Sequence, residues 1–155
     1  MTIKIIINGT EKDISISEGE LLLEVLRRKG YKGVKKGCLS GECGACTVLL
    51  DGRPVNSCLV LAADVNGRQI TTIEGLGTPE KPHMLQRIFV QAGAVQCGYC
   101  TPGMILSTKA LLDKNPKPSE SQIKKALDGN FCRCTGYVKI IDAVKTASRK
   151  LKKKR

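Results

Sequence analysis

The chain has 155 residues, of which 41% are hydrophobic, 26% are charged and eight are cysteines. This composition is that of one medium or two small globular domains, and it excludes collagen-like and disordered chains. The longest apolar run, residues 58–63, is far shorter than the roughly 20 residues of a membrane span, so we expect a soluble chain. The first residues lack the cleavage site and apolar core of a secretory signal, which predicts a cytoplasmic location.

The net charge of +12 is concentrated at the C-terminal end. Residues 145–155 hold seven lysines and arginines and no acidic residue, and we interpret them as a solvated helix end that leads into a basic tail over residues 148–155. The chain has no Trp and three Tyr, and it contains no recognised DNA- or RNA-binding motif. We therefore expect no nucleic-acid partner, with a docking surface as the alternative role of the tail.

The first half of the chain predicts a small sheet. Ile3, Ile5 and Ile7 alternate with other residues before Asn8-Gly9, which is the pattern of antiparallel strands joined by a two-residue turn. A second hairpin is expected at Asp51-Gly52, and a last strand is expected near residues 69–73.

One helix is expected within this sheet domain. Ser17 and Glu20 have the spacing of a capping box, which predicts a helix start. The apolar stripe that follows, residues 21–26, stops before Gly30, a residue that favours a helix C-terminus.

The periodicity of the chain changes after residues 75–82, which combine Gly, Pro and polar residues. Beyond them, apolar residues repeat about every 3.6 positions instead of every two. We therefore predict one domain over residues 1–76 and a second over residues 77–147. The second domain should hold four helices: Pro82 to Gly93, Thr101 to Leu112, Ser119 to Gly129, and one that starts after Thr135 or Gly136.

The first four cysteines have the spacing C-x4-C-x2-C-x11-C: Cys38, Cys43, Cys46 and Cys58. This spacing is that of a plant-type [2Fe–2S] loop, in which three thiolates of one loop wrap around a compact anionic cluster. We expect Gly37, Gly41 and Gly44 to relieve the Cβ clashes of such wrapping and to let backbone N–H groups reach the sulfurs. Structural zinc, which favours paired C-x2-C knuckles, is the alternative.

The last four cysteines have the spacing C-x2-C-x31-C-x1-C: Cys97, Cys100, Cys132 and Cys134. Each pair precedes a predicted helix, so two helix N-termini would face one anionic site. Their spacing leaves three interpretations open: an iron–sulfur cluster, a four-thiolate zinc site, or a dithiol redox pair at Cys97 and Cys100. The plant-type loop elsewhere in the chain favours the cluster.

Three segments carry a wider resemblance: G-E-C-G-A-C-T-V at residues 41–48, Q-C-G-Y-C-T-P-G-M at 96–104 and G-N-F-C-R-C-T-G-Y at 129–137. Together they resemble the iron–sulfur subunit of the xanthine oxidase family of molybdenum hydroxylases, over about residues 3–147. The resemblance implies an α+β fold, with an N-terminal β-grasp, plant-type ferredoxin-like domain followed by a four-helix bundle domain. It implies an electron-transfer subunit of an oxidoreductase for an aldehyde, purine or N-heterocycle, without substrate catalysis by this chain alone.

The resemblance also assigns ligands, which it carries over by position. It implies two [2Fe–2S] clusters, the first nearer a flavin and the second nearer a molybdopterin: Cys38, Cys43, Cys46 and Cys58 for the first, and Cys97, Cys100, Cys132 and Cys134 for the second. Gln96 and the backbone at Cys134 match positions that contact the pterin cofactor. Without the resemblance, Gln96 would be interpreted as an ordinary polar cap on its own loop.

The resemblance implies partner chains as well. These are a large subunit with molybdopterin, as the cytosine dinucleotide, and a medium subunit with FAD, in a hetero-oligomer such as a dimer of heterotrimers. The alternative function, from a different class, is a zinc-stapled interaction module with a basic tail.

Two remaining residues have weaker signals. His83, the only histidine, lies at a predicted helix start, where a surface or capping role is favoured over a ligand or acid–base role. Arg133 lies between two predicted ligands and is interpreted as a charge partner for the cluster or for a neighbouring chain. We predict no catalytic residue in this chain.

Overall fold

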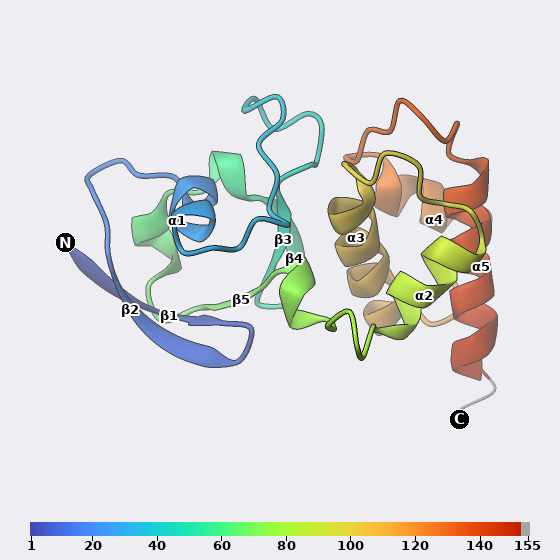
Figure 1. The fold of residues 1–155 in the computed structure, drawn as a ribbon, viewed down its shortest axis with the longest axis horizontal. Coiled ribbons are helices and arrows are strands. Elements are labelled where there is room, and N and C mark those ends of the chain that lie inside the picture. The colour runs from blue at the N-terminus through green and yellow to red at the C-terminus, as the bar shows by residue number, and fades with distance from the viewer. Residues whose placement is uncertain (153–155) are drawn as a thin grey trace.

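The structure is a computed structural model and describes residues 1–152. Its N-terminal half is a five-stranded mixed sheet with a short helix packed on it (Figure 1). The strands lie in the order β2-β1-β5-β3-β4, with β1 parallel to β5 and the other neighbours antiparallel. The elements are β1 (Thr2–Ile7), β2 (Thr10–Ser15), α1 (Leu22–Arg28), β3 (Thr47–Leu50), β4 (Arg53–Asn56) and β5 (Gln69–Thr71).

The predicted alternation of the first strand is confirmed. Ile3, Ile5 and Ile7 of β1 are at most 1% exposed and form the core of the sheet half with α1. Both predicted two-residue turns are present, because Asn8-Gly9 and Asp51-Gly52 have positive φ at both positions, as such a turn requires.

The start of α1 differs from the prediction. The Glu20 carboxylate accepts a hydrogen bond from the backbone N–H of Ser17 at 3.0 Å, as in a capping box, but the helix begins only at Leu22. The reason is tertiary: Leu21 forms a β-bridge with Leu61, which keeps the backbone extended at that point.

The C-terminal half consists of four helices around a second apolar core. They are α2 (Met84–Gln91), α3 (Thr101–Lys114), α4 (Glu120–Leu127) and α5 (Val138–Lys152). The predicted start at Thr101 is confirmed, and so is the cap at Ser119, whose hydroxyl accepts from the backbone N–H of Gln122 at 3.2 Å. Across residues 1–152, every helix is too short or too polar to cross a lipid bilayer.

The start of α2 is a second correction. Pro82 was expected at the first helical position, but it lies two residues before Met84 because His83 is the N-cap. His83 Nδ1 accepts from the backbone N–H of Leu85 at 3.2 Å, and Gln86 accepts from the backbone N–H of His83 at 2.7 Å. Burial lowers the pKa of His83, which favours the neutral ring that can accept this bond, so the predicted capping role is confirmed.

The C-terminal helix continues into the segment predicted as a basic tail. Ala147 is buried, and the Ser148 hydroxyl donates to the Pro116 carbonyl at 2.7 Å, so α5 packs onto the bundle past residue 147. Residues 153–155 of the predicted tail lie outside the described residues.

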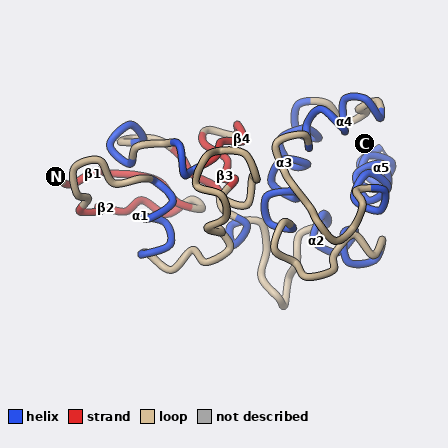
Figure 2. The backbone as a smooth tube through the Cα atoms, turned by 90° about the horizontal axis from the view of Figure 1, so that it is seen from above, coloured by secondary structure: helices blue, strands red, loops and turns tan. Residues whose placement is uncertain are grey.

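The two halves lie side by side, and α3 is the helix that faces the sheet (Figures 1 and 2). It packs against β3, β4 and the short turn at residues 73–75. The loop before β3 and the loops before α3 and α5 lie on the same edge of the molecule (Figure 1), so the segments that carry the cysteines are brought together there.

Candidate metal centres

The hairpin of β3 and β4 positions two of the first four cysteines. Cys46 directly precedes β3, and Cys58 lies in the turn that directly follows β4. Because Thr47 pairs with Asn56 at the open end of the hairpin, the two thiols are brought together, and both are buried. Burial raises the pKa of the Cys58 thiol to about 11, and the neighbouring Cys46 thiol acts in the same direction.

The loop before the hairpin carries the other two thiols, and their sulfurs accept backbone hydrogen bonds. The N–H groups of Glu42 and Cys43 donate to the Cys38 sulfur at 3.3 Å each, and the N–H of Cys38 donates to the Cys43 sulfur at 3.4 Å. The Ser40 hydroxyl and the backbone N–H of Cys43 both lie close to the Cys38 sulfur, and they lower the pKa of the Cys38 thiol to about 6. These donors stabilise a negative sulfur, as predicted.

The three glycines of this loop have different roles. A Cβ at Gly37 would lie 2.6 Å from the Cys43 sulfur, which confirms the expected clash at this position. A Cβ at Gly41 would instead meet the Leu59 side chain at 2.3 Å, and one at Gly44 would meet the carbonyl oxygen of Gly129 at 2.1 Å. The expected clash is therefore wrong for Gly41, which makes room for a side chain, and for Gly44, which makes room for the helical half. The backbone N–H of Gly41 is nevertheless directed at the Cys58 sulfur, where it acts to lower the pKa of that thiol, as expected.

The second four cysteines also approach one another in pairs. The sulfurs of Cys97 and Cys134 lie 3.6 Å apart, and the Cys100 thiol neighbours the Cys132 thiol. Burial raises the pKa of the Cys100 thiol to about 12, with the Cys132 thiol acting in the same direction. The pKa of Cys132 is lowered, because the Thr135 hydroxyl, 3.1 Å from its sulfur, and nearby backbone N–H groups outweigh the effect of burial.

One of the two expected helix N-termini borders these cysteines. Cys100 is the N-cap of α3 and lines the pocket between the cysteine loops. No residue of α5 lines that pocket, since α5 begins four residues after Cys134. Of the two expected helix N-termini, that of α3 lies at this pocket, and that of α5 lies outside the pocket wall.

The pairing of the thiols fits a binuclear cluster. Each iron of a [2Fe–2S] cluster takes two cysteine thiolates, so one cluster needs two facing pairs. Among residues 1–152, no three His, Cys, Asp or Glu side chains converge closely enough to hold a single ion. The contacts above group the eight thiols two by two: Cys38 with Cys43, Cys46 with Cys58, Cys97 with Cys134, and Cys100 with Cys132.

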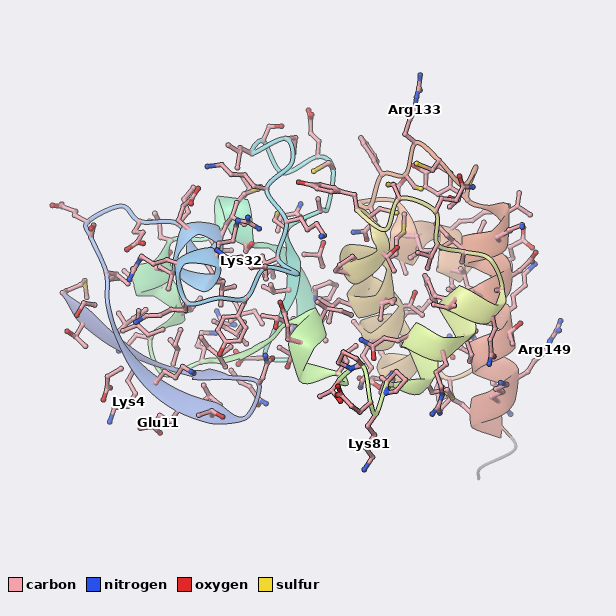
Figure 3. The ribbon with its side chains drawn as sticks, viewed as in Figure 1. Lys4, Glu11, Lys32, Lys81, Arg133 and Arg149 are labelled. Atoms are coloured by element: carbon pink, nitrogen blue, oxygen red, sulfur yellow. The ribbon has the colours of Figure 1, made fainter. Side chains whose placement is uncertain are left out.

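A pocket of about 270 Å³ lies between the two sets of thiols. Its wall includes six of the eight cysteines, from both halves of the chain: Cys38, Cys43, Cys97, Cys100, Cys132 and Cys134. Cys46 and Cys58 lie outside it, in the core of the sheet half. Arg133 also lines this pocket, and its exposed side chain extends outward from the molecule (Figure 3).

The predicted pterin contacts lie on the outside of the second site. Cys134 and Gln96 are both exposed.

The structure also reveals a residue that sequence reasoning did not single out. Asn130 is 3% exposed, and its amide joins the two halves of the chain. Its only sequence signal is its place in the third motif, next to Phe131 and Cys132, because no periodicity or spacing marks a polar residue of this kind.

The fold defines an α+β protein in which the sheet half and the helical half each carry one set of four cysteines. Residues 5–71 match the family model of a 2Fe-2S iron-sulfur cluster binding domain, and residues 72–145 match that of a [2Fe-2S] binding domain. The chain is 51% identical over 148 residues to the nicotinate dehydrogenase small FeS subunit of Eubacterium barkeri, covering 95% of this chain and 94% of the relative.

Two solved structures are similar to the whole chain. Quinoline 2-oxidoreductase from Pseudomonas putida 86 has a TM-score of 0.93 at 41% identity, covering 99% of this chain and 96% of that chain. Aldehyde oxidoreductase from Desulfovibrio gigas has a TM-score of 0.95 at 44% identity, covering 100% of this chain. This chain spans only 18% of the latter protein.

The chain therefore belongs to the family of small [2Fe–2S] subunits of the xanthine dehydrogenase-type molybdenum hydroxylases. It is a two-[2Fe–2S] electron-transfer subunit of a multisubunit oxidoreductase, and the predicted ferredoxin-like and helical architecture is confirmed. The alternative of a zinc-stapled interaction module is wrong.

Proposed function

We propose that each set of four cysteines holds one cluster and that the chain passes single electrons between a molybdopterin site on a large subunit and a FAD-binding medium subunit. The observation that supports this proposal is the pocket whose wall includes thiols of both sets, because electrons can pass between clusters only over a short distance. Each bound cluster supplies reversible one-electron exchange. The residues of this chain supply the thiolates, the backbone N–H donors at the sulfurs, and the partial exclusion of water.

The assignment of the second set to the molybdopterin side is supported by the surface around it. Tyr99 and Phe131, which flank the second set, are 48% and 59% exposed, although aromatic side chains favour burial. A surface of this kind suits a permanent partner, and a permanent interface should exceed ~2,000 Å² in total. The partner we propose is the molybdopterin-binding large subunit, within a hetero-oligomer such as a dimer of heterotrimers in the cytoplasm.

The names of similar proteins suggest the substrate class. Relatives of 51% and 47% identity are named for nicotinate and for xanthine, and a similar solved structure is named for quinoline. We therefore favour an N-heterocycle over an aldehyde as the substrate of the assembled complex, with molybdopterin as the cytosine dinucleotide on the large subunit. We also propose that the boundary between the two domains lies between residues 76 and 77.

Metal analysis tests the cluster assignment directly. Complex purified without air should contain about four irons and about four acid-labile sulfides per small subunit, because two sets of four thiolates hold two binuclear clusters. Reduction by one electron per cluster should give two distinguishable paramagnetic resonance signals. One zinc per four cysteines, with no labile sulfide, would refute the assignment.

Gln96 is the second test, because its exposed amide is proposed to bind the pterin cofactor across the subunit interface. Gln96→Ala should then leave polar groups of the cofactor unpaired, at a cost of ~1–3 kcal/mol. Molybdenum occupancy or the rate of cluster reduction by substrate should fall. If Gln96 only capped its loop, the change would cost ~0.5–2 kcal/mol of stability. A lower melting temperature with normal occupancy and normal reduction would contradict the proposed contact.

A further inference from the structure

A single buried amide joins the two halves of the chain. The Asn130 amide nitrogen donates to the Gly44 carbonyl at 3.1 Å and to the Thr47 hydroxyl at 3.2 Å, both in the sheet half. Its carbonyl oxygen accepts from the Ser107 hydroxyl of α3 at 2.7 Å. Since Asn130 and Ser107 are 3% and 4% exposed, these hydrogen bonds are shielded from water, where an unpaired partner is costly.

Two glycines let the backbones of the two halves approach around this amide. A Cβ at Gly44 would lie 2.4 Å from the Asn130 amide nitrogen, and a Cβ at Gly103 would lie 2.4 Å from the Gly44 carbonyl oxygen. Gly44 also has φ +68°, a conformation that disfavours any residue with a Cβ. The contact is therefore closely packed as well as hydrogen-bonded.

The contact joins the two cysteine loops themselves. Gly44 lies between Cys43 and Cys46, and Asn130 lies two residues before Cys132. Directly beside the amide, the backbone N–H of Phe131 donates to the Cys43 carbonyl at 2.9 Å. Any shift of one loop relative to the other has to break these hydrogen bonds.

We propose that Asn130 is a positioning residue that sets the separation and the relative orientation of the two clusters. This inference rests on the ligand assignment proposed above. The step it serves is the transfer of one electron from a reduced cluster to an oxidised one, in which the donor is oxidised by one electron, the acceptor is reduced by one electron, and no bond forms or breaks. Because Asn130 holds both ligand loops, it keeps constant the distance that this electron crosses.

The test compares Asn130→Asp with Asn115→Asp in the assembled complex. Asp keeps the size of Asn and the acceptor for Ser107, but its ionised carboxylate cannot donate to the Gly44 carbonyl. Asn115, also in the helical half, donates its amide to Gln122 at 3.1 Å within that half, so it is a matched control. Ser107→Ala is a milder second variant, because it removes only the hydrogen bond that orients the Asn130 amide.

Two measurements decide the role. Hydrogen exchange at the Phe131 amide should accelerate by about 5- to 150-fold in Asn130→Asp, the range expected for losing buried hydrogen bonds, and should be unchanged in Asn115→Asp. In complex reduced with dithionite, both cluster signals should persist, but the spin–spin splitting between them should be lost or blurred. Ser107→Ala should also accelerate exchange at the Phe131 amide and weaken the spin–spin splitting, but by less than Asn130→Asp.

Each other outcome contradicts a specific statement. Faster exchange with unchanged splitting would make Asn130 a purely structural residue and would overturn the positioning role. Unchanged exchange and splitting in Asn130→Asp would also overturn it. If Asn130→Asp loses its clusters, the exchange rate at the Phe131 amide and the spin–spin splitting are measured in Ser107→Ala instead. An unchanged splitting in Ser107→Ala would then overturn the positioning role. An unmodified complex without two signals would overturn the ligand assignment, whereas two coupled signals that Asn130→Asp leaves unaltered would overturn only the positioning role.

Discussion

Replacing Cys43 by serine should remove the first cluster and leave the second one in place. Cys43 is paired with Cys38 through two backbone hydrogen bonds, one accepted by each sulfur, and a serine oxygen is a poor replacement for a thiolate on iron. The second set of thiols lies in the other half of the chain, around a separate apolar core. The iron content should therefore fall from about four to about two per small subunit.

The electron-transfer phenotype of Cys43→Ser should be equally selective. The assembled complex should still accept electrons at molybdenum, but it should pass them slowly to flavin, because the cluster proposed on that side is missing. Resonance spectra of the reduced complex should lack one of the two signals. Cys97→Ser is the mirror variant and should remove the other signal. Loss of both signals from either single substitution would contradict two independent sites.

Replacing Gly44 by alanine should destabilise the iron-loaded chain by about 2–5 kcal/mol. Two effects add: the left-handed backbone at φ +68° costs about 1–2 kcal/mol with a Cβ, and overpacking costs about 1–3 kcal/mol. The overpacking arises because the new Cβ would lie 2.1 Å from the carbonyl oxygen of Gly129, a backbone atom that cannot rotate away.

Gly52→Ala is the matched control for this substitution. Gly52 has φ +78°, close to that of Gly44, but no atom lies within 4 Å of its Cβ position. Its cost should therefore be the conformational part alone, about 1–2 kcal/mol. Urea unfolding of the two iron-loaded variants measures the difference. Equal losses of stability would show that the contact with Gly129 adds nothing.

The local elements of this protein were predictable because short-range forces determine them. The alternation of Ile3, Ile5 and Ile7 depends only on the two-residue period of a strand, and the turn at Asn8-Gly9 depends on the ease with which these residues take positive φ. The cap at Ser119 likewise involves a partner three residues away. The spacing of the cysteines within each loop belongs to the same class of local information.

Other features depended on partners distant in the sequence and became visible only in the tertiary structure. Leu21 failed to start a helix because Leu61, forty residues later, pairs with its backbone. Gly44 makes room for the helical half and not for the sulfurs of its own loop. Asn130 binds a carbonyl 86 residues away, and no periodicity in the sequence encodes such a partner.

The sequence by itself thus determined the strands, most of the helices and the two sets of thiols. How the two halves pack, and therefore how the two cysteine loops face each other, was decided by long-range packing and hydrogen bonding that form only when the chain is folded.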